Sequence, residues 1–267
     1  MGTLLYKFKP IEEKYDKNQK SINYTLDTLE SKQLWVPCLE NLNDPQDFSF
    51  SLENPYCHCN PFWIADVQKV FFQERACLSF SKSFTSKRLW NYYTDGMKGI
   101  VLAYDADDIR KSLNCCGYFA PGYNNDQRIF YEGSVEYDGD YTDMTDYYKL
   151  CSGQTGLQFV SAESYFHKDD TWKDEDEYRF SFELPDGNTI GMLLDNLVPK
   201  EIIVGYRIET KYKKRVEDFC VANGVKLYVV FPDFAKKSMR FVKKTLYYPN
   251  VDKDNQSYYY SEFIPYT

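Results

Sequence analysis

The sequence predicts an α+β fold with mixed, mostly antiparallel sheets and flanking helices. Hydrophobic residues make up 43% of the 267-residue chain and aromatic residues 18%, with 25 Tyr and 19 Phe. Rings are typical of strands, and this apolar content is too high for a disordered chain. No low-complexity linker divides the chain, so we expect a single domain over 1–267. Its core is expected at 1–231, with an elaboration near 107–166 and an aromatic tail at 232–267 packed on the core.

The first third of the chain is predicted to alternate short strands with helices. Residues 4–8 alternate as a strand does, and Ser21 is predicted to cap a helix whose apolar face carries Ile22, Leu26 and Leu29. The other elements expected here are a strand at 33–37, a turn at 42–45 where Asp44 precedes Pro45, a helix from Pro61 to Glu74 and a strand at 77–81.

The remainder is predicted to contain one strand–helix–strand unit. It runs through a buried strand at 201–205, a helix at 211–222 that Asn223-Gly224 closes, and a strand at 225–231. Before it we expect a helical turn at 89–93, a strand at 100–104, a helix from Asp105, a strand at 128–137, an irregular helical region to Phe166, and a strand from Glu175.

Charge and apolar runs exclude several classes of protein. The net charge of −8 gives no general attraction to nucleic acid or to anionic membranes. A basic strip at Lys211, Lys213, Lys214 and Arg215 is interpreted as the solvated face of a helix. The start of the chain lacks a secretory signal, and no apolar run reaches the 18 residues that span a bilayer. A cytoplasmic protein with no membrane partner is therefore expected.

The cysteines and histidines do not predict a metal centre. Eight scattered cysteines without an export signal are expected to be reduced thiols. The runs Cys57-His58-Cys59 and Cys115-Cys116 lack the ligand spacing of structural zinc sites. Only two histidines, His58 and His167, are present, which argues against a catalytic triad or a multi-histidine site. We therefore expect no metal.

A Glu-x-Glu pair leads into an aromatic strand and is the first candidate site. The strand is expected to carry both carboxylates, so that Glu175, Glu177 and Arg179 share one face, while Tyr178 and the phenylalanines after it enter the core. The carboxylates would then lie about 7 Å apart. They would form either a reactive pair or simply the solvated side of a sheet.

Two hydroxyls form the second candidate. In the strand at 77–81, alternation places Leu78 and Phe80 on one face and Ser79 and Ser81 on the other. The serines are either part of a polar site or ordinary strand hydroxyls.

The order of several short blocks resembles a widespread bacterial and phage family of uncharacterised domains, over most of residues 1–231. The blocks are Leu5-Tyr6-Lys7-Phe8, Leu42-Asn43-Asp44-Pro45, Cys77-Leu78-Ser79-Phe80-Ser81, Leu89-Trp90-Asn91-Tyr92-Tyr93, Lys98-Gly99-Ile100, and Trp172 followed by Glu175, Glu177, Tyr178 and Arg179.

That family is in turn distantly similar to the ADP-ribosyltransferase superfamily. Its members carry an Arg, His or Tyr on the first strand, then a Ser-rich strand, then a late Glu, often in Glu-x-Glu. Tyr6 or Lys7, Ser79-Phe80-Ser81 and Glu175-Asp176-Glu177 stand here in that order. The chain departs from the pattern in lacking a first-strand Arg, in placing Phe80 where Thr is common, and in a long insertion before the Glu strand. The resemblance implies an ADP-ribosyltransferase-like fold with NAD as substrate.

The resemblance also implies catalytic roles. Glu177 would hold the ribose hydroxyl and stabilise the positive charge that builds on the sugar when nicotinamide leaves, as in glycoside cleavage. Glu175 would orient or deprotonate the attacking nucleophile, and Ser79 would position Glu177 or the nicotinamide amide.

Further residues would bind the dinucleotide. Tyr6 would stack on a base, or Lys7 would meet the pyrophosphate; only one of them can face the cleft. Ser81 would support the strand, and Arg179 would contact phosphate or neutralise Glu177. Trp90 and Tyr93, with Trp172 beside them, would either wall an aromatic slot or belong to the core. Lys168 would contact phosphate, and Asn43 and Asp44 would either organise a loop over the site or form a plain turn.

Three functions remain open at this point. The first is an NAD-consuming enzyme, either an ADP-ribosyltransferase acting on a protein or nucleic acid or an NAD glycohydrolase, in a toxin or phage-defence setting. The second is a non-catalytic module of the same fold that binds a nucleotide or a protein. The third is a metal-dependent nuclease built on Asp174, Glu175 and Glu177, which the acidic charge and the lack of supporting histidines disfavour.

Overall fold

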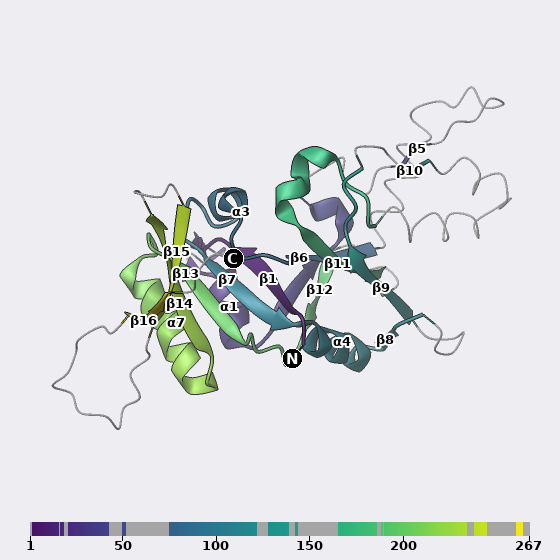
Figure 1. Ribbon diagram of the computed structural model, residues 1–267. Coiled ribbons are helices and arrows are strands. Elements are labelled where there is room, and N and C mark those ends of the chain that lie inside the picture. The colour runs from purple at the N-terminus through teal and green to yellow at the C-terminus, as the bar shows by residue number, and fades with distance from the viewer. Residues whose placement is uncertain are drawn as a thin grey trace, which may run out of the picture. The chain divides into compact units, whose positions relative to one another are not determined.

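The computed structural model forms two compact units, each assembled from segments that are distant in the sequence. Unit 1 contains Met1–Leu34, Ser81–Ile109 and Asp195–Thr267, and unit 2 contains Trp35–Phe80 and Arg110–Leu194. The structure describes residues 2–15, 17–18, 21–42, 50–51, 75–121, 128–138, 142–143, 165–185, 188, 190–233, 238–244 and 260–263 (Figure 1). Most of the predicted turn at 42–45, the predicted helix at 61–74 and most of the predicted helical region before Phe166 lie outside these residues.

Unit 1 is built on six strands that pair mostly antiparallel, as the sequence predicts. Their order is β16-β15-β14-β13-β7-β1. The strands are β1 (Leu4–Lys9), β7 (Ile100–Asp105), β13 (Glu201–Gly205), β14 (Lys226–Asp233), β15 (Ser238–Lys244) and β16 (Tyr260–Phe263). Within this order, the parallel pair is β13 with β14, which confirms the predicted strand–helix–strand unit. The last two strands come from the tail.

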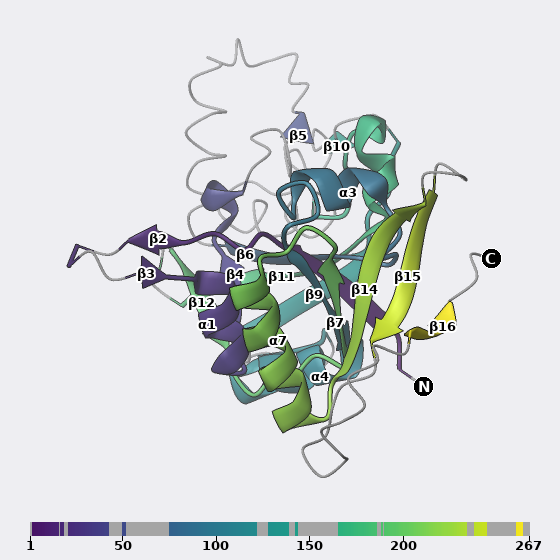
Figure 2. The ribbon, with the colours of Figure 1, turned by 90° about the vertical axis from the view of Figure 1, so that its left-hand side faces the viewer.

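Helices α1 (Tyr24–Glu30) and α7 (Thr210–Asn223) lie side by side in unit 1 (Figure 2). Gly224 closes α7 in the left-handed conformation, at φ +67°, as the Asn-Gly pair predicts. The predicted cap of α1 is wrong: Ser21 lies in a short strand, β3 (Ser21–Ile22), which pairs with β2 (Lys14–Tyr15). Because this pairing keeps the chain extended, the helix starts later, and Asn23 accepts the Leu26 N–H at 3.1 Å.

The predicted basic strip on α7 is paired with acidic side chains. Arg215 binds Asp27 and Glu30 of α1 at 2.8 and 2.7 Å, and Lys211 binds Glu13 at 2.8 Å. These surface pairs remove much of the positive charge that a nucleic acid would need. No helix in the described part of the chain is long and apolar enough to cross a membrane.

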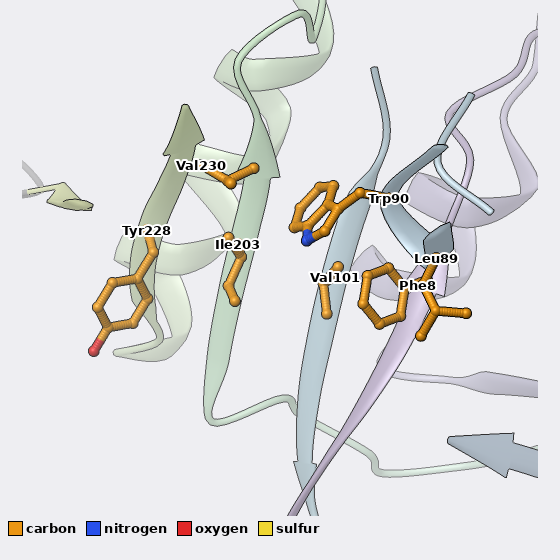
Figure 3. Packing of buried hydrophobic residues seen from close by; sticks show 7 residues of the cluster. All are labelled: Phe8, Leu89, Trp90, Val101, Ile203, Tyr228 and Val230. Atoms are coloured by element: carbon orange, nitrogen blue, oxygen red, sulfur yellow. The ribbon is translucent and has the colours of Figure 1, made fainter. Parts of the chain in front are cut away.

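The short helix α3 (Lys87–Tyr92) covers an apolar cluster of unit 1. Ser86 caps it by accepting the Leu89 N–H. Trp90 is fully buried among side chains of β1, β7 and β13, and its indole N–H donates to the Phe84 carbonyl at 2.8 Å (Figure 3). The buried members of the cluster are Phe8, Leu89, Trp90, Val101, Ile203, Tyr228 and Val230.

Unit 2 contains a second run of strands in the order β6-β11-β9-β8. These are β6 (Arg75–Ser81), whose last residue belongs to unit 1, β11 (Glu177–Glu183), β9 (Arg128–Ser134) and β8 (Tyr118–Phe119). Two small sheets pair β4 (Leu34–Pro37) with β12 (Gly191–Leu194) and β5 (Phe50–Ser51) with β10 (Thr142–Asp143). The helical segments in the described part of unit 2 are α4 (Ala106–Cys115), which is shared by both units, and the 3-10 turns η1 (Leu39–Asn41) and η2 (Asp170–Glu175).

Both faces of β11 are buried, which the sequence did not predict. Phe180 and Phe182 enter an aromatic core as expected; Phe180 packs against Phe80 and Phe130 with ring centroids 6.2 Å apart in each pair. On the other face, Arg179 and Ser181 are also fully buried. The interpretation of this face as a solvated side is therefore wrong, because other parts of unit 2 cover it.

Candidate functional site

Four charged side chains are buried together where β11 begins in unit 2. Lys168, Glu175, Glu177 and Arg179 have relative exposures of 9%, 5%, 6% and 0%. Burying a charge is costly unless it is paired, so this set can only persist as a network of ion pairs. We refer to these four residues as the Glu177 cluster.

The local backbone brings Glu175 and Glu177 together, but not by strand alternation. Glu175 is the last residue of η2, whose first turn is capped by Asp169, and Glu177 is the first residue of β11. Between them Asp176 adopts a left-handed conformation at φ +43°. The prediction that one strand carries both carboxylates is therefore wrong, because this turn breaks the alternation before β11 starts.

The cluster pairs two cations with two carboxylates. The Lys168 ammonium donates to Oε2 of Glu175 at 2.7 Å and to Oε2 of Glu177 at 3.4 Å. The Arg179 guanidinium donates to the same Oε2 of Glu177 at 2.8 Å and to the Tyr165 carbonyl at 2.8 Å. The formal charges of the four side chains sum to zero, which offsets part of the desolvation cost of burying them.

Glu177 stays ionised in spite of its burial. Desolvation alone would raise its pKa, but the charges of Arg179 and Lys168, with hydrogen bonds from Arg179 and Ser79, outweigh it and hold the pKa at about 2. The predicted association of Ser79 with Glu177 is thus present within unit 2. At neutral pH the carboxylate accepts hydrogen bonds and does not donate them.

Two aromatic residues complete the surroundings of the cluster. The phenol oxygen of Tyr137 accepts the backbone N–H of Glu177 at 2.9 Å. Burial, together with the charges of Glu177 and Glu175, raises the pKa of Tyr137 above its ordinary value, so the phenol is neutral. The Lys168 ammonium lies 5.0 Å from the centroid of the Trp172 ring, a cation–π contact.

Acid should weaken unit 2 through Glu177. A carboxylate whose pKa is lower in the folded chain than the ordinary value of about 4.3 adds stability above about pH 4.3, and this stability is lost as the pH falls toward 2. Since one pKa unit corresponds to about 1.4 kcal/mol, the contribution is on the order of 3 kcal/mol. Urea unfolding at several pH values should show wild type losing more stability than Glu177→Gln between pH 4.5 and 2.5. Parallel losses in the two proteins would contradict this.

The network disfavours the metal-dependent nuclease. A divalent metal would have to use the carboxylates of Glu175 and Glu177, but the ammonium of Lys168 already binds both. Asp174, the third expected ligand, is exposed. What the arrangement offers instead is an ionised carboxylate held in one orientation by fixed donors.

The predicted dinucleotide-binding residues lie in different parts of the chain. Arg179 is inside the Glu177 cluster, where it neutralises Glu177; of the two roles predicted for it, the structure shows this one. Tyr6, Lys7, Ser81, Trp90 and Tyr93 belong to unit 1. Asn43 lies outside the described residues.

Within unit 1, Tyr6 and Ser81 are neighbours and Trp90 is not available to a ligand. Tyr6 and Ser81 are register partners in the sheet, and the half-buried Tyr6 ring packs on Phe84 at 5.1 Å. Lys7 is partly buried on the same strand. Trp90 is fully buried in the apolar cluster and offers no ring face for a base, while Tyr93, the C-cap of α3, is a partly buried residue at its margin.

Sequence reasoning missed Tyr137, and it gave Lys168 a different partner from the one observed. Lys168 was expected to meet a phosphate, but it binds carboxylates seven and nine residues further along the chain. Tyr137 is 40 residues from the backbone N–H that it accepts. The Tyr137 contact depends on how distant segments of unit 2 pair, and the Lys168 contacts depend on how η2 folds the chain between Lys168 and Glu177. Strand alternation marks neither.

Comparison with known proteins supports in part the resemblance to a family of uncharacterised domains. No curated protein and no solved structure shows a significant match. The segment that does match a family model includes Lys168 and the three other members of the Glu177 cluster, but it begins after Ser79. Residues 89–180 match the model of an uncharacterised domain family, described as "Protein of unknown function (DUF2971)".

Proposed function

We propose that the protein consumes NAD, by cleaving the bond between nicotinamide and ribose. Nicotinamide leaves with the bonding electrons, and a water or a macromolecular nucleophile forms the new bond to the ribose carbon and releases a proton. With water the enzyme is an NAD glycohydrolase, and with a protein or nucleic acid acceptor it is an ADP-ribosyltransferase. NAD is then a substrate and not a bound cofactor.

One observation carries the proposal: the Glu177 carboxylate is held by Arg179 at 2.8 Å and by Lys168 at 3.4 Å. These two cations, with a hydrogen bond from Ser79, favour its ionised form. Cleavage builds positive charge on the ribose, and a preorganised negative charge stabilises that transition state more than the ground state. Arg179 and the Tyr137 phenol fix the carboxylate and its backbone and so reduce the reorganisation needed during reaction. Glu175 would act on the nucleophile.

The setting proposed with this chemistry is a bacterial toxin or phage-defence protein that acts in the cytoplasm. The support for this setting, and for an ADP-ribosyltransferase-like fold, is the resemblance of the ordered sequence blocks to the bacterial and phage family and to the ADP-ribosyltransferase superfamily. The Ser-rich strand and the late Glu contribute Ser79 and Glu177, two residues that contact each other in unit 2.

Nicotinamide release from labelled NAD tests the proposal directly. Glu177→Gln should lower turnover by about a hundredfold or more, the usual effect of removing one transition-state contact. Ser79→Ala keeps the charges of the cluster and should lower kcat by about tenfold with little change in KM. Glu183→Gln, at the exposed end of the same strand, should turn over NAD like wild type.

Two outcomes would overturn the NAD-consuming function. One is a folded wild type that releases no nicotinamide with or without candidate acceptors, and the other is full turnover by Glu177→Gln. Following the label in the same assay separates the two activities, since transfer places ADP-ribose on the acceptor and hydrolysis leaves it free.

A second candidate is a non-catalytic module that binds a nucleotide or a protein. It is favoured by the low exposure of Glu177, 6%, and by the two cations that already bind its carboxylate. Calorimetry would support this function if NAD binds and raises the melting temperature while no nicotinamide is released. Binding followed by release would exclude it.

A further inference from the structure

Two short extended segments of unit 2, at 136–138 and 167–168, lie side by side and point successive side chains to opposite sides. Glu136 and His167 form a bridge in which the Glu136 N–H donates to the Phe166 carbonyl at 2.6 Å and the Lys168 N–H donates to the Glu136 carbonyl at 3.0 Å. Lys168 belongs to the Glu177 cluster, and Tyr137 accepts the backbone N–H of Glu177. Since successive side chains of extended segments point to opposite sides, their neighbours in the chain turn away from it.

Those neighbours bring together three metal-binding side chains. Glu136 and Asp138 are exposed, and His167 is partly exposed. His167 Nδ1 lies 2.8 Å from Oδ2 of Asp138, and one ligand atom from each of the three residues lies within 4.8 Å of the others. Ligand atoms of a tetrahedral zinc site, with bonds of about 2.0–2.1 Å, are roughly 3.3 Å apart. Small side-chain rotations would therefore close this set around an ion.

We propose that Glu136, Asp138 and His167 bind a divalent transition metal, with zinc as the best fit. An imidazole nitrogen beside two carboxylates suits Zn²⁺ and its neighbours better than Mg²⁺ or Ca²⁺, which prefer oxygen ligands alone. Two carboxylates and a neutral imidazole balance the charge of the ion. Three protein ligands leave a coordination position for water, as in zinc sites that are open to solvent.

The metal would stabilise the geometry of the Glu177 cluster from outside. It would tie the segment that carries Tyr137 to the segment that carries Lys168, in addition to the backbone bridge between them. This inference does not depend on NAD turnover, because it concerns different side chains of the same two segments. His167 is 29 residues from Asp138 in the sequence, which is why the sequence predicted no metal.

The site can be tested by titrating the metal-free protein with Zn²⁺ and measuring the heat of binding by calorimetry. We expect one equivalent to bind to wild type, and His167→Ala and Asp138→Asn each to weaken the affinity by at least about tenfold. Residues that only hydrogen-bond to a metal ligand already change metal affinity by about tenfold or more when they are mutated. Removing a ligand itself should weaken the affinity at least as much. Both side chains are at least partly exposed, so the variants should keep the circular dichroism spectrum of wild type.

The matched control distinguishes this site from the one other cluster in the sequence that contains a histidine. His58→Ala changes the only other histidine, which stands between Cys57 and Cys59, and should leave Zn²⁺ affinity unchanged. Co²⁺ bound to wild type should give a spectrum without the sulfur-to-metal charge-transfer bands of thiolate ligation. Absence of binding, unchanged binding by His167→Ala, loss of binding in His58→Ala, or thiolate bands would each overturn the proposal.

Discussion

Replacing Arg179 with Met is expected to lower the free energy of unfolding by about 3–5 kcal/mol, the cost of breaking a buried ion pair from one side. Arg179 is fully buried and donates both to Glu177 and to the Tyr165 carbonyl. Without it, the cluster keeps two carboxylates against the single cation of Lys168, and the buried charge becomes unbalanced. The carbonyl of Tyr165 also loses a donor.

Urea unfolding of Arg179→Met measures this effect, and Arg215→Met is the matched control. Arg215 also forms ion pairs, with Asp27 and Glu30, but its side chain is 36% exposed, against 0% for Arg179. Because each surface ion pair contributes about 0–1 kcal/mol and Arg215 forms one with Asp27 and one with Glu30, the control should lose no more than about 2 kcal/mol. If both variants lost the same free energy of unfolding, burial would not explain the strength of the Arg179–Glu177 ion pair.

Charge balance can be tested on the same background. Adding Glu177→Gln to Arg179→Met leaves Lys168 paired with Glu175 and returns the formal charge of the cluster to zero. The double variant should therefore lose less stability than the sum of the two single variants. An additive result in the double-mutant cycle would mean that Glu177 and Arg179 do not interact energetically.

Replacing Trp90 with Ala is expected to cost about 3–5 kcal/mol, as for other buried aromatic side chains. The ring packs edge-on against Phe8, with centroids 5.6 Å apart, and its N–H satisfies the Phe84 carbonyl. Truncation leaves a cavity in the apolar cluster of unit 1 and removes this hydrogen bond. Both terms lower the stability of the folded chain.

The same variant tests the sequence-based hypothesis that Trp90 lines an aromatic slot. Chemical denaturation should show a large loss for Trp90→Ala and a change within about 0.5 kcal/mol for Tyr92→Ala, since Tyr92, in the same helix, is 71% exposed. If Trp90 served a ligand, its truncation would weaken NAD binding and leave stability unchanged. That result would argue against the packing seen here.

Local patterns in the sequence were enough to predict half of the described strands and the end of α7. Alternation located the strands that became β1, β6 and β11, and an unbroken apolar run located β13. Gly224 ends α7 because glycine adopts the left-handed conformation at little cost. Such signals act within a few residues, so they survive in any tertiary context.

Only the tertiary structure decided what happens to the face that carries Glu177. Alternation says which side chains share a face, but not whether another segment covers that face. The cluster depends on Lys168, Tyr137 and Ser79, which reach Glu177 from three separate segments. Once these segments exclude water, an unpaired charge becomes too costly, and burial turns a row of polar residues into a fixed network of ion pairs.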